Sequence, residues 1–492
     1  MSSISEKYHR SSLQRIARRV MLERGLLPDF SDQAIAELRS LPDTISKPDK
    51  SIRDMRDLLW CSIDNDDSED LDQLTVAAEL PDGAVKILVA IADVDVYVKK
   101  ALAIDEHARH NTTSVYTAAQ VFTMLPEKLS YDLTSLNYEE DRLALVVESV
   151  ISANGEMQDS NIYRALVRNR AKLAYNSVAA WLDGNGPMPE GINNVAGLPD
   201  NLRLQQRVAQ KLKSIRHNHG ALDFETIEAR PVFDEEEIIS LEVQSRNCAR
   251  EIIEDLMIAA NGVTAKYLEK KGFPSLRRVV RTPKKWDRIV EIAAQHNYVL
   301  PRDAEPKALA QFLAAMKASD PLRFHDLSLS IIKLLGAGEY VVERPGEPPL
   351  GHFGLAVKNY EHSTAPNRRY PDVITQRLLK AAIAGDPVPY EINELEMIAR
   401  HCTETENIVR KVERQVEKSA AAILMEGRIG EKFDAIITGA SEKGIWVRLL
   451  QLPIEGKLAE HFSGQAVGHR VRVKLIHTNV EQGYIDFKRI GR

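Results

Sequence analysis

The sequence contains few cysteines and no long apolar run. Its three cysteines, Cys61, Cys248 and Cys402, lie far apart and form no CxxC pair. They support neither a zinc ribbon nor a disulfide scaffold, and they suit a reducing compartment. The N-terminal residues lack the apolar core of a signal peptide, and no apolar run reaches transmembrane length. We therefore expect a cytoplasmic protein that does not enter a membrane.

Aromatic residues make up only 6% of the chain, and positive charge is not in excess. The 65 Lys and Arg residues against 71 Asp and Glu residues give a net charge of −6. A chain of this charge that acts on an anionic polymer must concentrate its positive charge locally. With 492 residues, 44% of them hydrophobic, the chain is long enough for a substantial core and roughly three domains.

Negative charge is concentrated in one short segment. Between Asp64 and Asp72, six of nine residues are carboxylates, directly after the apolar run Leu58-Leu59-Trp60. Such a segment repels itself unless a cation or solvent screens it. One interpretation is a solvated acidic loop, and the other is a site for Mg²⁺ or Mn²⁺. A calcium-binding loop is excluded, because Glu69 and Thr75 stand where that loop needs Gly and Glu.

The residues after the acidic segment predict two strands, over 74–80 and 85–94. The second is almost entirely apolar, which is typical of a strand buried on both faces. Clustered carboxylates beside a buried strand are costly unless their charge is compensated. This position favours the metal-site interpretation.

Helical periodicity appears in three parts of the chain. Residues 1 to about 50 predict two short amphipathic helices, and residues 246–270 and 392–425 predict longer ones. The first helix carries Arg10, Arg15, Arg18 and Arg19 near its polar side. These arginines either form a solvated face or touch phosphates.

Two basic segments are candidates for contact with phosphate groups. Arg277, Arg278, Arg281, Lys284, Lys285 and Arg288 form the densest one. It is either a solvated face or a contact for a nucleic-acid backbone. In the other, Arg368 and Arg369 lie between Pro366 and Pro371. A guanidinium in such a loop suits bidentate phosphate binding, and a structural salt bridge is the alternative.

The last 65 or so residues change to a strand pattern. Five short alternating segments with Gly at the turns occur between residues 433 and 488. Basic and aromatic residues alternate along them. This pattern predicts an OB-fold barrel that binds single-stranded nucleic acid.

Taken in order, these segments resemble the RNB family of ribonuclease II and ribonuclease R. The resemblance covers about residues 51–425, and the barrel resembles the S1-type domain of those enzymes. The motifs that carry it are the Asp-rich loop, Val89–Val94, Thr113–Tyr116, Met124–Glu127, Gly220–Phe224, Glu254–Asn261 and Pro366–Asp372.

The resemblance implies an α+β fold in three parts. An N-terminal helical segment (1–50) is expected to precede an RNB catalytic domain (51–425) with a mixed β-sheet core surrounded by helices. An S1-type OB-fold β-barrel (426–492) follows it. The pair of cold-shock domains that usually precedes an RNB domain is missing from this sequence, so we expect a short form with a smaller RNA footprint and stronger salt sensitivity.

The resemblance also implies processive 3′→5′ hydrolysis of single-stranded RNA to nucleoside 5′-monophosphates. The chemistry would be Mg²⁺-dependent, or Mn²⁺-dependent, and of the two-metal type. The implied catalytic residues are Asp70, Asp72 and Arg368, and the implied metal-site residues are Asp64, Asp70, Asp72 and Gln73. The implied RNA-binding residues are Tyr116, Tyr175, Phe224, Glu254, Tyr370 and Glu413. We expect a monomer that needs no obligate protein partner.

The sequence departs from the family at Gln73, where a second adjacent aspartate is usual. A carboxamide offers an oxygen without the charge, so this position motivates an alternative function: a catalytically impaired RNB scaffold that binds RNA. Two further departures, Asn367 before Arg368 and Gln376 where His is common, agree with an intact site.

Overall fold

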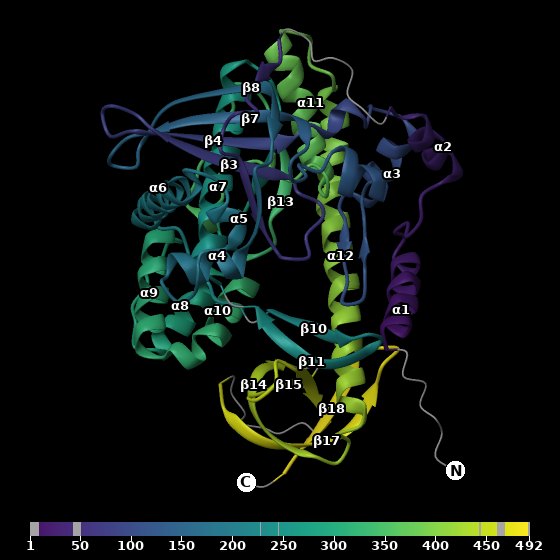
Figure 1. Cartoon of the computed structure of the whole chain (residues 1–492). Helices are drawn as coiled ribbons and strands as arrows, with labels where there is room; N and C mark the ends of the chain where they lie inside the picture. The colour runs from purple at the N-terminus through teal and green to yellow at the C-terminus, as the bar shows by residue number, and fades with distance from the viewer. Residues whose placement is uncertain are drawn as a thin grey trace.

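The structure is a computed structural model that describes residues 9–42, 51–226, 228–244, 246–441, 444–459 and 468–490. Figure 1 shows a large upper body, a small barrel below it, and one long helix, α12 (Ile392–Glu426), that runs from the first to the second. The expected α+β body followed by a β-barrel is therefore confirmed. The domain boundary that we expected near residue 50 lies outside the described residues.

The upper body is built on a mixed sheet of seven strands. The pairs β1–β8 and β2–β9 run parallel, and the other neighbours run antiparallel. In sheet order the strands are β1 (Arg53–Asp54), β8 (Met157–Arg168), β7 (Asp141–Ile151), β4 (Val85–Ala92), β3 (Gln73–Glu79), β2 (Cys61–Asp64) and β9 (Ala171–Ala174). Central strand β4 is buried apart from Lys86, which is half-buried, as its apolar run predicted.

Helices surround this sheet. Helix α6 (Leu198–Asn218) is tied to β3, because the Thr75 hydroxyl donates to Gln205 Oε1 over 2.7 Å. Helix α7 (Cys248–Lys270) matches the helix predicted over 246–270. The other helices are α2 (Asp32–Ser40), α3 (Ala103–Asn111), α4 (Tyr175–Leu182), α5 (Glu190–Asn193), α8 (Trp286–Gln295), α9 (Pro306–Ser319), α10 (Pro321–Leu335) and α11 (Tyr370–Ala384).

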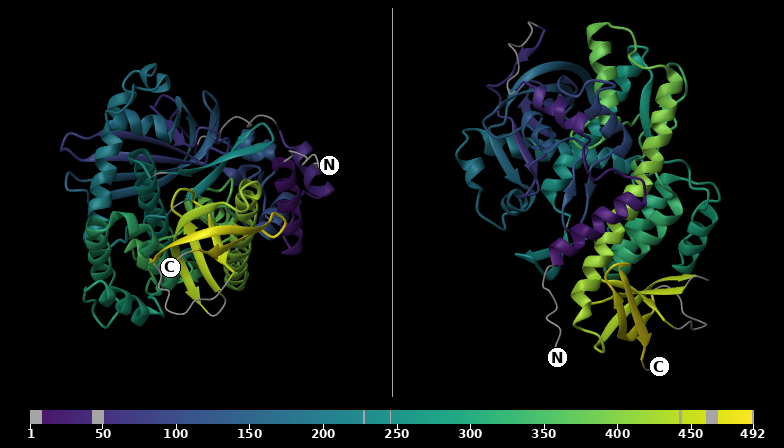
Figure 2. Two further views of the ribbon diagram at one scale, coloured as in Figure 1. Left: turned by 90° about the horizontal axis from the view of Figure 1, so that it is seen from below. Right: turned by 90° about the vertical axis from the view of Figure 1, so that its right-hand side faces the viewer.

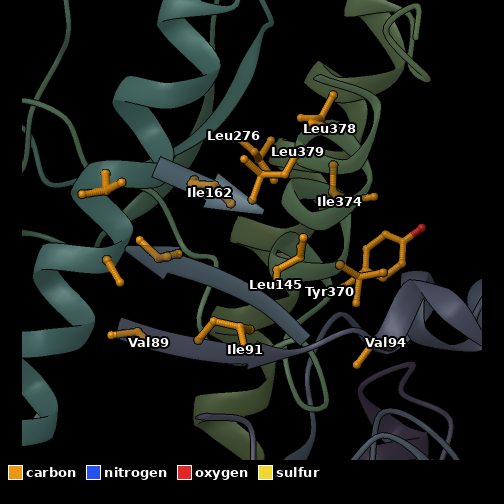
Figure 3. Close-up of a cluster of buried hydrophobic side chains, with 14 of the residues drawn as sticks. Val89, Ile91, Val94, Leu145, Ile162, Leu276, Tyr370, Ile374, Leu378 and Leu379 are labelled. Carbon is orange, nitrogen blue, oxygen red and sulfur yellow. The ribbon is translucent and has the colours of Figure 1, made fainter. Parts of the chain in front are cut away.

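The largest apolar cluster joins the sheet to α11 (Figure 3). Ile91 of β4 and Leu145 of β7 share this cluster with Ile374 and Leu378 of α11. Burial of so many aliphatic side chains is the main force that holds α11 against the sheet. The loop that precedes α11, which carries Arg368, is thereby fixed at one end.

The N-terminal helix α1 (His9–Glu23) links several parts of the molecule. Its predicted apolar face is fully buried and packs with side chains of α12 and of a two-stranded hairpin, β5 (Val115–Tyr116) and β6 (Val121–Phe122). Figure 2 shows α1 beside α12 just above the barrel. Its polar face carries exposed ion pairs, from Arg15 and Arg19 to Glu481 of the barrel. These two arginines therefore contact a neighbouring domain.

The C-terminal barrel is closed, as the five alternating segments predicted. Its strands are β14 (Lys432–Ser441), β15 (Gly444–Leu449), β16 (Glu455–Leu458), β17 (Arg470–Asn479) and β18 (Tyr484–Arg489). The turn between β17 and β18 touches α12, where Gln415 Nε2 donates to the Gln482 carbonyl over 2.8 Å. Among the described residues, no helix combines the length and apolarity needed to cross a membrane.

A second hairpin crosses between the body and the barrel (Figure 1). Its strands, β10 (Glu228–Asp234) and β11 (Glu237–Gln244), pair antiparallel. The tip is tied to α1, because the Arg10 backbone N–H donates to the Glu236 carbonyl over 3.0 Å. The hairpin therefore lies over the end of the body that faces the barrel.

Two residues of the densest basic segment do not belong to the surface that we considered for RNA backbone contacts, whereas the other four, Arg281, Lys284, Lys285 and Arg288, are exposed and their part stays a prediction. Arg277 and Arg278 lie in β12 (Ser275–Val279), which pairs with β13 (Glu339–Glu343), and both side chains are buried. Arg277 is bound to Glu343, and Arg278 is bound to Glu406 of α12 by two hydrogen bonds. The RNA-contact interpretation is wrong for these two residues, because burial and pairing leave them no free surface.

Candidate active site

The acidic segment is a loop between two strands of the sheet. Asp64 ends β2, and Asp72 directly precedes β3, where its carbonyl accepts from the Ala92 N–H over 3.0 Å. The hydroxyl of Ser135 holds the loop in between, since it accepts from the Leu71 N–H at 3.0 Å and donates to the Glu69 carbonyl at 2.7 Å. The fold therefore brings the carboxylates to one end of the sheet.

The arginine loop meets the acidic loop at Asp72. Asp72 Oδ1 accepts from the Asn367 N–H over 2.9 Å, and Asp72 Oδ2 accepts from Arg368 Nε over 3.1 Å. The Asp72 side chain is 1% exposed, whereas the Arg368 side chain is 44% exposed. Among the described residues, this guanidinium donates hydrogen bonds only through Nε, so its terminal nitrogens remain available to a ligand.

Two buried contacts fix the arginine loop from behind. Asn367 Oδ1 accepts from the Thr134 hydroxyl over 2.6 Å. Asp372 Oδ1 accepts from Arg369 Nη2 at 2.7 Å and from the Ala365 N–H at 2.8 Å. Of the two arginines, Arg369 therefore forms the structural salt bridge and Arg368 points into the site. The salt-bridge interpretation is confirmed for Arg369, and phosphate binding by Arg368 stays a prediction.

A cavity of about 720 Å³ opens beside these carboxylates. Asp70 lies in its wall and accepts from the Tyr116 hydroxyl over 2.7 Å. The Tyr116 backbone N–H donates to Glu413 Oε1 over 3.0 Å. The opposite wall comes from the β10–β11 hairpin, including Arg230 and Phe233. The cavity thus collects three of the predicted site residues, together with a hairpin that the sequence did not single out.

Burial shifts the proton affinity of these carboxylates. It raises the pKa of Asp72 to about 8, and Asp70 acts in the same direction, whereas Arg368 and the Asn367 N–H oppose it. Burial also raises the pKa of Asp70 and of Glu413, and in both cases a hydrogen bond from Tyr116 opposes the shift. The raised pKa values of these carboxyls therefore come mainly from burial, which the charge of Arg368 offsets only in part at Asp70 and Asp72.

The donor set fits a hard divalent cation. Asp64, Asp70 and Asp72 offer only carboxylate oxygens, which are the ligands that Mg²⁺ and Mn²⁺ prefer. Within the described residues, however, no three acidic, His or Cys side chains already stand at spacing suited to an ion. Instead each carboxylate is bonded to a protein group: Asp64 to Ser68 and the Asn65 N–H, Asp70 to Tyr116, and Asp72 to the arginine loop.

Gln73 lies next to Asp72 but on the other side of the backbone. It is buried, begins β3 and pairs with Ile91. Successive side chains of a strand alternate between faces, so Gln73 shares its face with Thr75, which contacts α6. The structure therefore places Gln73 away from the Asp72–Arg368 pair, and its part in a metal site stays a prediction.

Tyr175 lies close to the acidic loop, because β9 runs parallel to β2 and pairs Ala174 with Asp64. Glu254 and Phe224 belong to a second set of residues, which is centred on Arg246. Arg246 donates to Glu254 Oε2 over 2.7 Å and to Asp223 Oδ1 over 2.9 Å. Phe224 follows Asp223 and packs partly against the apolar cluster of α8, α9 and α10.

Tyr370 is a correction to the sequence analysis. It was predicted to contact RNA, but its side chain is 2% exposed and lies in the core cluster with Leu145 and Ile374 (Figure 3). A ring that is buried among aliphatic side chains has no face for a base. The aromatic residue that begins α11 therefore anchors the arginine loop and does not contact RNA.

Several residues at the site carry no local signal in the sequence. Asn367, Ser135 and Arg230 are isolated polar residues whose partners or neighbours at the site are far away in the chain; Asn367, for example, bonds a residue 295 positions away. Of the three, only Asn367 was noted from the sequence, as a departure before Arg368, and its bond to Asp72 was not predicted.

Comparison with known proteins identifies the family. The model of the RNB domain matches residues 52–385, and the model of the RNase II-type exonuclease C-terminal S1 domain matches residues 431–490. The chain belongs to the RNB family. Ribonuclease R of Aquifex aeolicus (strain VF5) is 32% identical to this RNB-family chain over 450 residues, which is 90% of this chain and 62% of that protein. The chain thus spans less than two thirds of that relative's length.

Solved structures confirm the fold. The structure of Mycoplasma genitalium RNase R in complex with ribose methylated single-stranded RNA superposes with a TM-score of 0.87 at 24% identity, covering 97% of this chain and 78% of that one. Yeast Ssd1, a pseudonuclease, superposes with a TM-score of 0.71 at 16% identity, covering 90% of this chain and 55% of that one. The RNB fold is therefore found in a pseudonuclease as well as in a ribonuclease.

Proposed function

We propose that this RNB-family chain is a processive 3′→5′ exoribonuclease that hydrolyses single-stranded RNA to nucleoside 5′-monophosphates. The observation that carries the proposal is the pair of Asp72 and Arg368. A buried carboxylate holds the guanidinium through Nε, and the other end of the arginine remains exposed. Ribonuclease R of Aquifex aeolicus, which is 32% identical to this chain, supports the same activity.

Each charged residue of the site has a part in this proposal. The terminal nitrogens of Arg368 contact the scissile phosphate and stabilise the charge that develops on it. Asp64, Asp70 and Asp72 hold Mg²⁺ or Mn²⁺, which supplies Lewis acidity for attack by water. Asp72 also fixes the direction of Arg368, so its loss affects both functions.

The aromatic side chains provide contacts that do not depend on base identity. Tyr116, which is exposed at the cavity, and Phe224 stack on bases, and Tyr175 and Glu254 hold the last nucleotide. Glu413 keeps Tyr116 in place by accepting a hydrogen bond from the Tyr116 backbone N–H. The barrel adds a surface for single-stranded RNA.

The direct test is incubation of the protein and Mg²⁺ with single-stranded RNA that is labelled along its whole length, with EDTA as the control. We expect mononucleotides to accumulate with Mg²⁺ and full-length RNA to persist with EDTA. Persistence of full-length RNA with Mg²⁺ and with Mn²⁺ overturns the proposal. Release of internal fragments without mononucleotides indicates an endonuclease instead.

The second candidate is a catalytically impaired RNB scaffold that binds RNA. Gln73 favours it, because an uncharged residue stands in the acidic segment beside Asp72. The pseudonuclease among the structural neighbours adds support, since the RNB fold alone does not guarantee activity. Retention of RNA binding without mononucleotide release in the same assay favours this candidate.

We further infer that the protein works in the cytoplasm as a monomer. The free cysteines, two of which are buried, suit a reducing compartment. We also propose the division into residues 1–50, 51–425 and 426–492. Limited proteolysis tests this division, and light scattering of the same sample tests the monomeric state.

A further inference from the structure

Arg250 lies at the start of α7, where the helix faces the acidic loop. Asn247 caps this helix, and its Oδ1 accepts from the Arg250 N–H over 3.0 Å. The cap is tied to α4 in turn, because Asn247 Nδ2 donates to Asn176 Oδ1 over 3.1 Å. The backbone of Arg250 is thus fixed relative to α4, the helix that begins with Tyr175.

The side chain of Arg250 makes two contacts in the site. Its guanidinium carbon lies 4.5 Å from the centroid of the Tyr175 ring, a cation–π distance. Its Nη2 donates to Asn65 Oδ1 over 2.7 Å. Asn65 is itself held, because its N–H donates to Asp64 Oδ1 over 2.7 Å. Arg250 therefore connects the Tyr175 ring to the acidic loop.

These contacts leave Tyr175 with two different faces. The ring is only half-buried, and Arg250 covers one side of it. Burial raises the pKa of its hydroxyl, and Asp64, Arg250 and Arg368 also influence it. Among the described residues, the buried Nε of Arg250 has no hydrogen-bond partner.

We propose that Arg250 is a positioning residue for the 3′-terminal nucleotide of the RNA. Anchored by Asn65, it holds the Tyr175 ring from one side, so that the other face stacks on the terminal base. Glu254, one helical turn further along α7, lies on the same face of the helix. In the proposed function it also holds the 3′-terminal nucleotide. This inference rests on the proposed function and adds a residue that acts through Tyr175.

The first experiment needs no catalysis. Binding of two short single-stranded RNAs is measured in EDTA, one intact and one whose last nucleotide lacks its base. We expect the wild-type protein to bind the intact RNA about 10-fold more tightly, the size of one base–aromatic stack. In R250M, which keeps a long side chain but loses the charge and the hydrogen bond, this preference falls to about twofold or less.

The second experiment separates kcat from KM on the same two substrates with Mg²⁺. We expect R250M to lose about 10-fold in kcat on the intact RNA and far less on the base-free RNA, because misplacement of the terminal nucleotide slows the chemical step. R250K restores part of the loss, since an ammonium still stacks on Tyr175. N65A reproduces part of the loss in kcat, because this change removes the residue that anchors Arg250.

R203M is the matched control. Arg203 of α6 also lies over an aromatic ring, at 5.0 Å from the Trp181 centroid, and its exposed side chain pairs with Asp200. We expect R203M to keep both the base preference and kcat. Thermal unfolding of all variants shows whether each is folded at the assay temperature.

Three outcomes overturn the inference: an unchanged base preference in R250M, equal losses on both RNAs, or the same losses in R203M. Equal losses indicate that Arg250 binds a phosphate directly. Failure of the wild-type protein to release mononucleotides overturns the proposed function instead, and the binding comparison still decides the role of Arg250.

Discussion

Two of the three pairs of adjacent arginines in the chain look alike in sequence and differ in structure. Arg277 and Arg278 lie in β12, and Arg368 and Arg369 lie in the loop before α11. All four are bound to carboxylates. Three of the side chains are largely buried, and only Arg368 is 44% exposed.

The ion pairs of Arg278 and Arg368 leave different parts of the arginine available. Arg278 uses both terminal nitrogens to bind Glu406, at 2.6 and 2.8 Å, which leaves none for a ligand. Arg368 uses Nε to bind Asp72, which fixes its direction and leaves the terminal fork open. The useful distinction is therefore which nitrogens are engaged, and the predictions below test it.

The largest effect is expected on stability, in R277M. This change leaves the Glu343 side chain, which is only 10% exposed, without its partner. An unpaired buried charge costs about 3–5 kcal/mol of the free energy of unfolding. Urea denaturation measures the loss of stability. The rate of RNA hydrolysis per folded molecule should stay unchanged. The double variant R277M/E343L should recover much of the stability, because it removes both charges. Loss of catalysis without loss of stability contradicts the structural role.

At Arg368 the expected effect is on catalysis and not on stability. R368A and D72N should both lower the rate of RNA hydrolysis. Each removes a group from the Asp72–Arg368 pair, and loss of such charge stabilisation costs at least ~10²-fold in rate. RNA binding should persist, because the barrel and the aromatic residues remain. Single-turnover rates and equilibrium binding measure the two effects separately. Normal turnover in both variants rejects the assignment of the site.

Much of the fold was predictable because it is encoded locally. The apolar run of β4, the periodicity of α7 and α12 and the alternating segments of the barrel each specify their own element. Asp64, Asp72 and Arg368 were recognised from motifs. The partners were not, because they depend on packing: Arg277 meets a residue 66 positions away, and Arg278 one 128 positions away. The same reason explains Tyr370, whose burial depends on how α11 meets the sheet.

A pH effect of intermediate size should come from Glu361 beside Arg277. Glu361 is 0% exposed, and burial raises its pKa from 4.5 to about 8, with Arg277 opposing and Glu343 and Asp372 adding to the shift. The folded protein keeps this proton to higher pH than the unfolded chain. The stability that it contributes is complete below pH 4.5 and declines as the pH rises towards 8.

Replacement of this carboxyl by an amide tests the sign. E361Q cannot release a proton, so its free energy of unfolding should fall less than that of the wild-type protein between pH 5 and pH 8, by more than about 1 kcal/mol. Urea denaturation at the two pH values measures this difference. Parallel pH dependence in both proteins shows that Glu361 is ionised when folded.

The smallest effect is expected where arginines are paired at the surface. Arg15 and Arg19 bind Glu481 of the barrel, and all three side chains are substantially exposed. Exposed pairs contribute about 0–1 kcal/mol and are screened by salt. E481Q should therefore shift the unfolding midpoint slightly at low salt and not at high salt. The apolar face of α1, which is fully buried against α12, should hold the helix in place without these pairs. Amide exchange along α1 checks this, and greatly faster exchange in E481Q would mean that the ion pairs hold the helix.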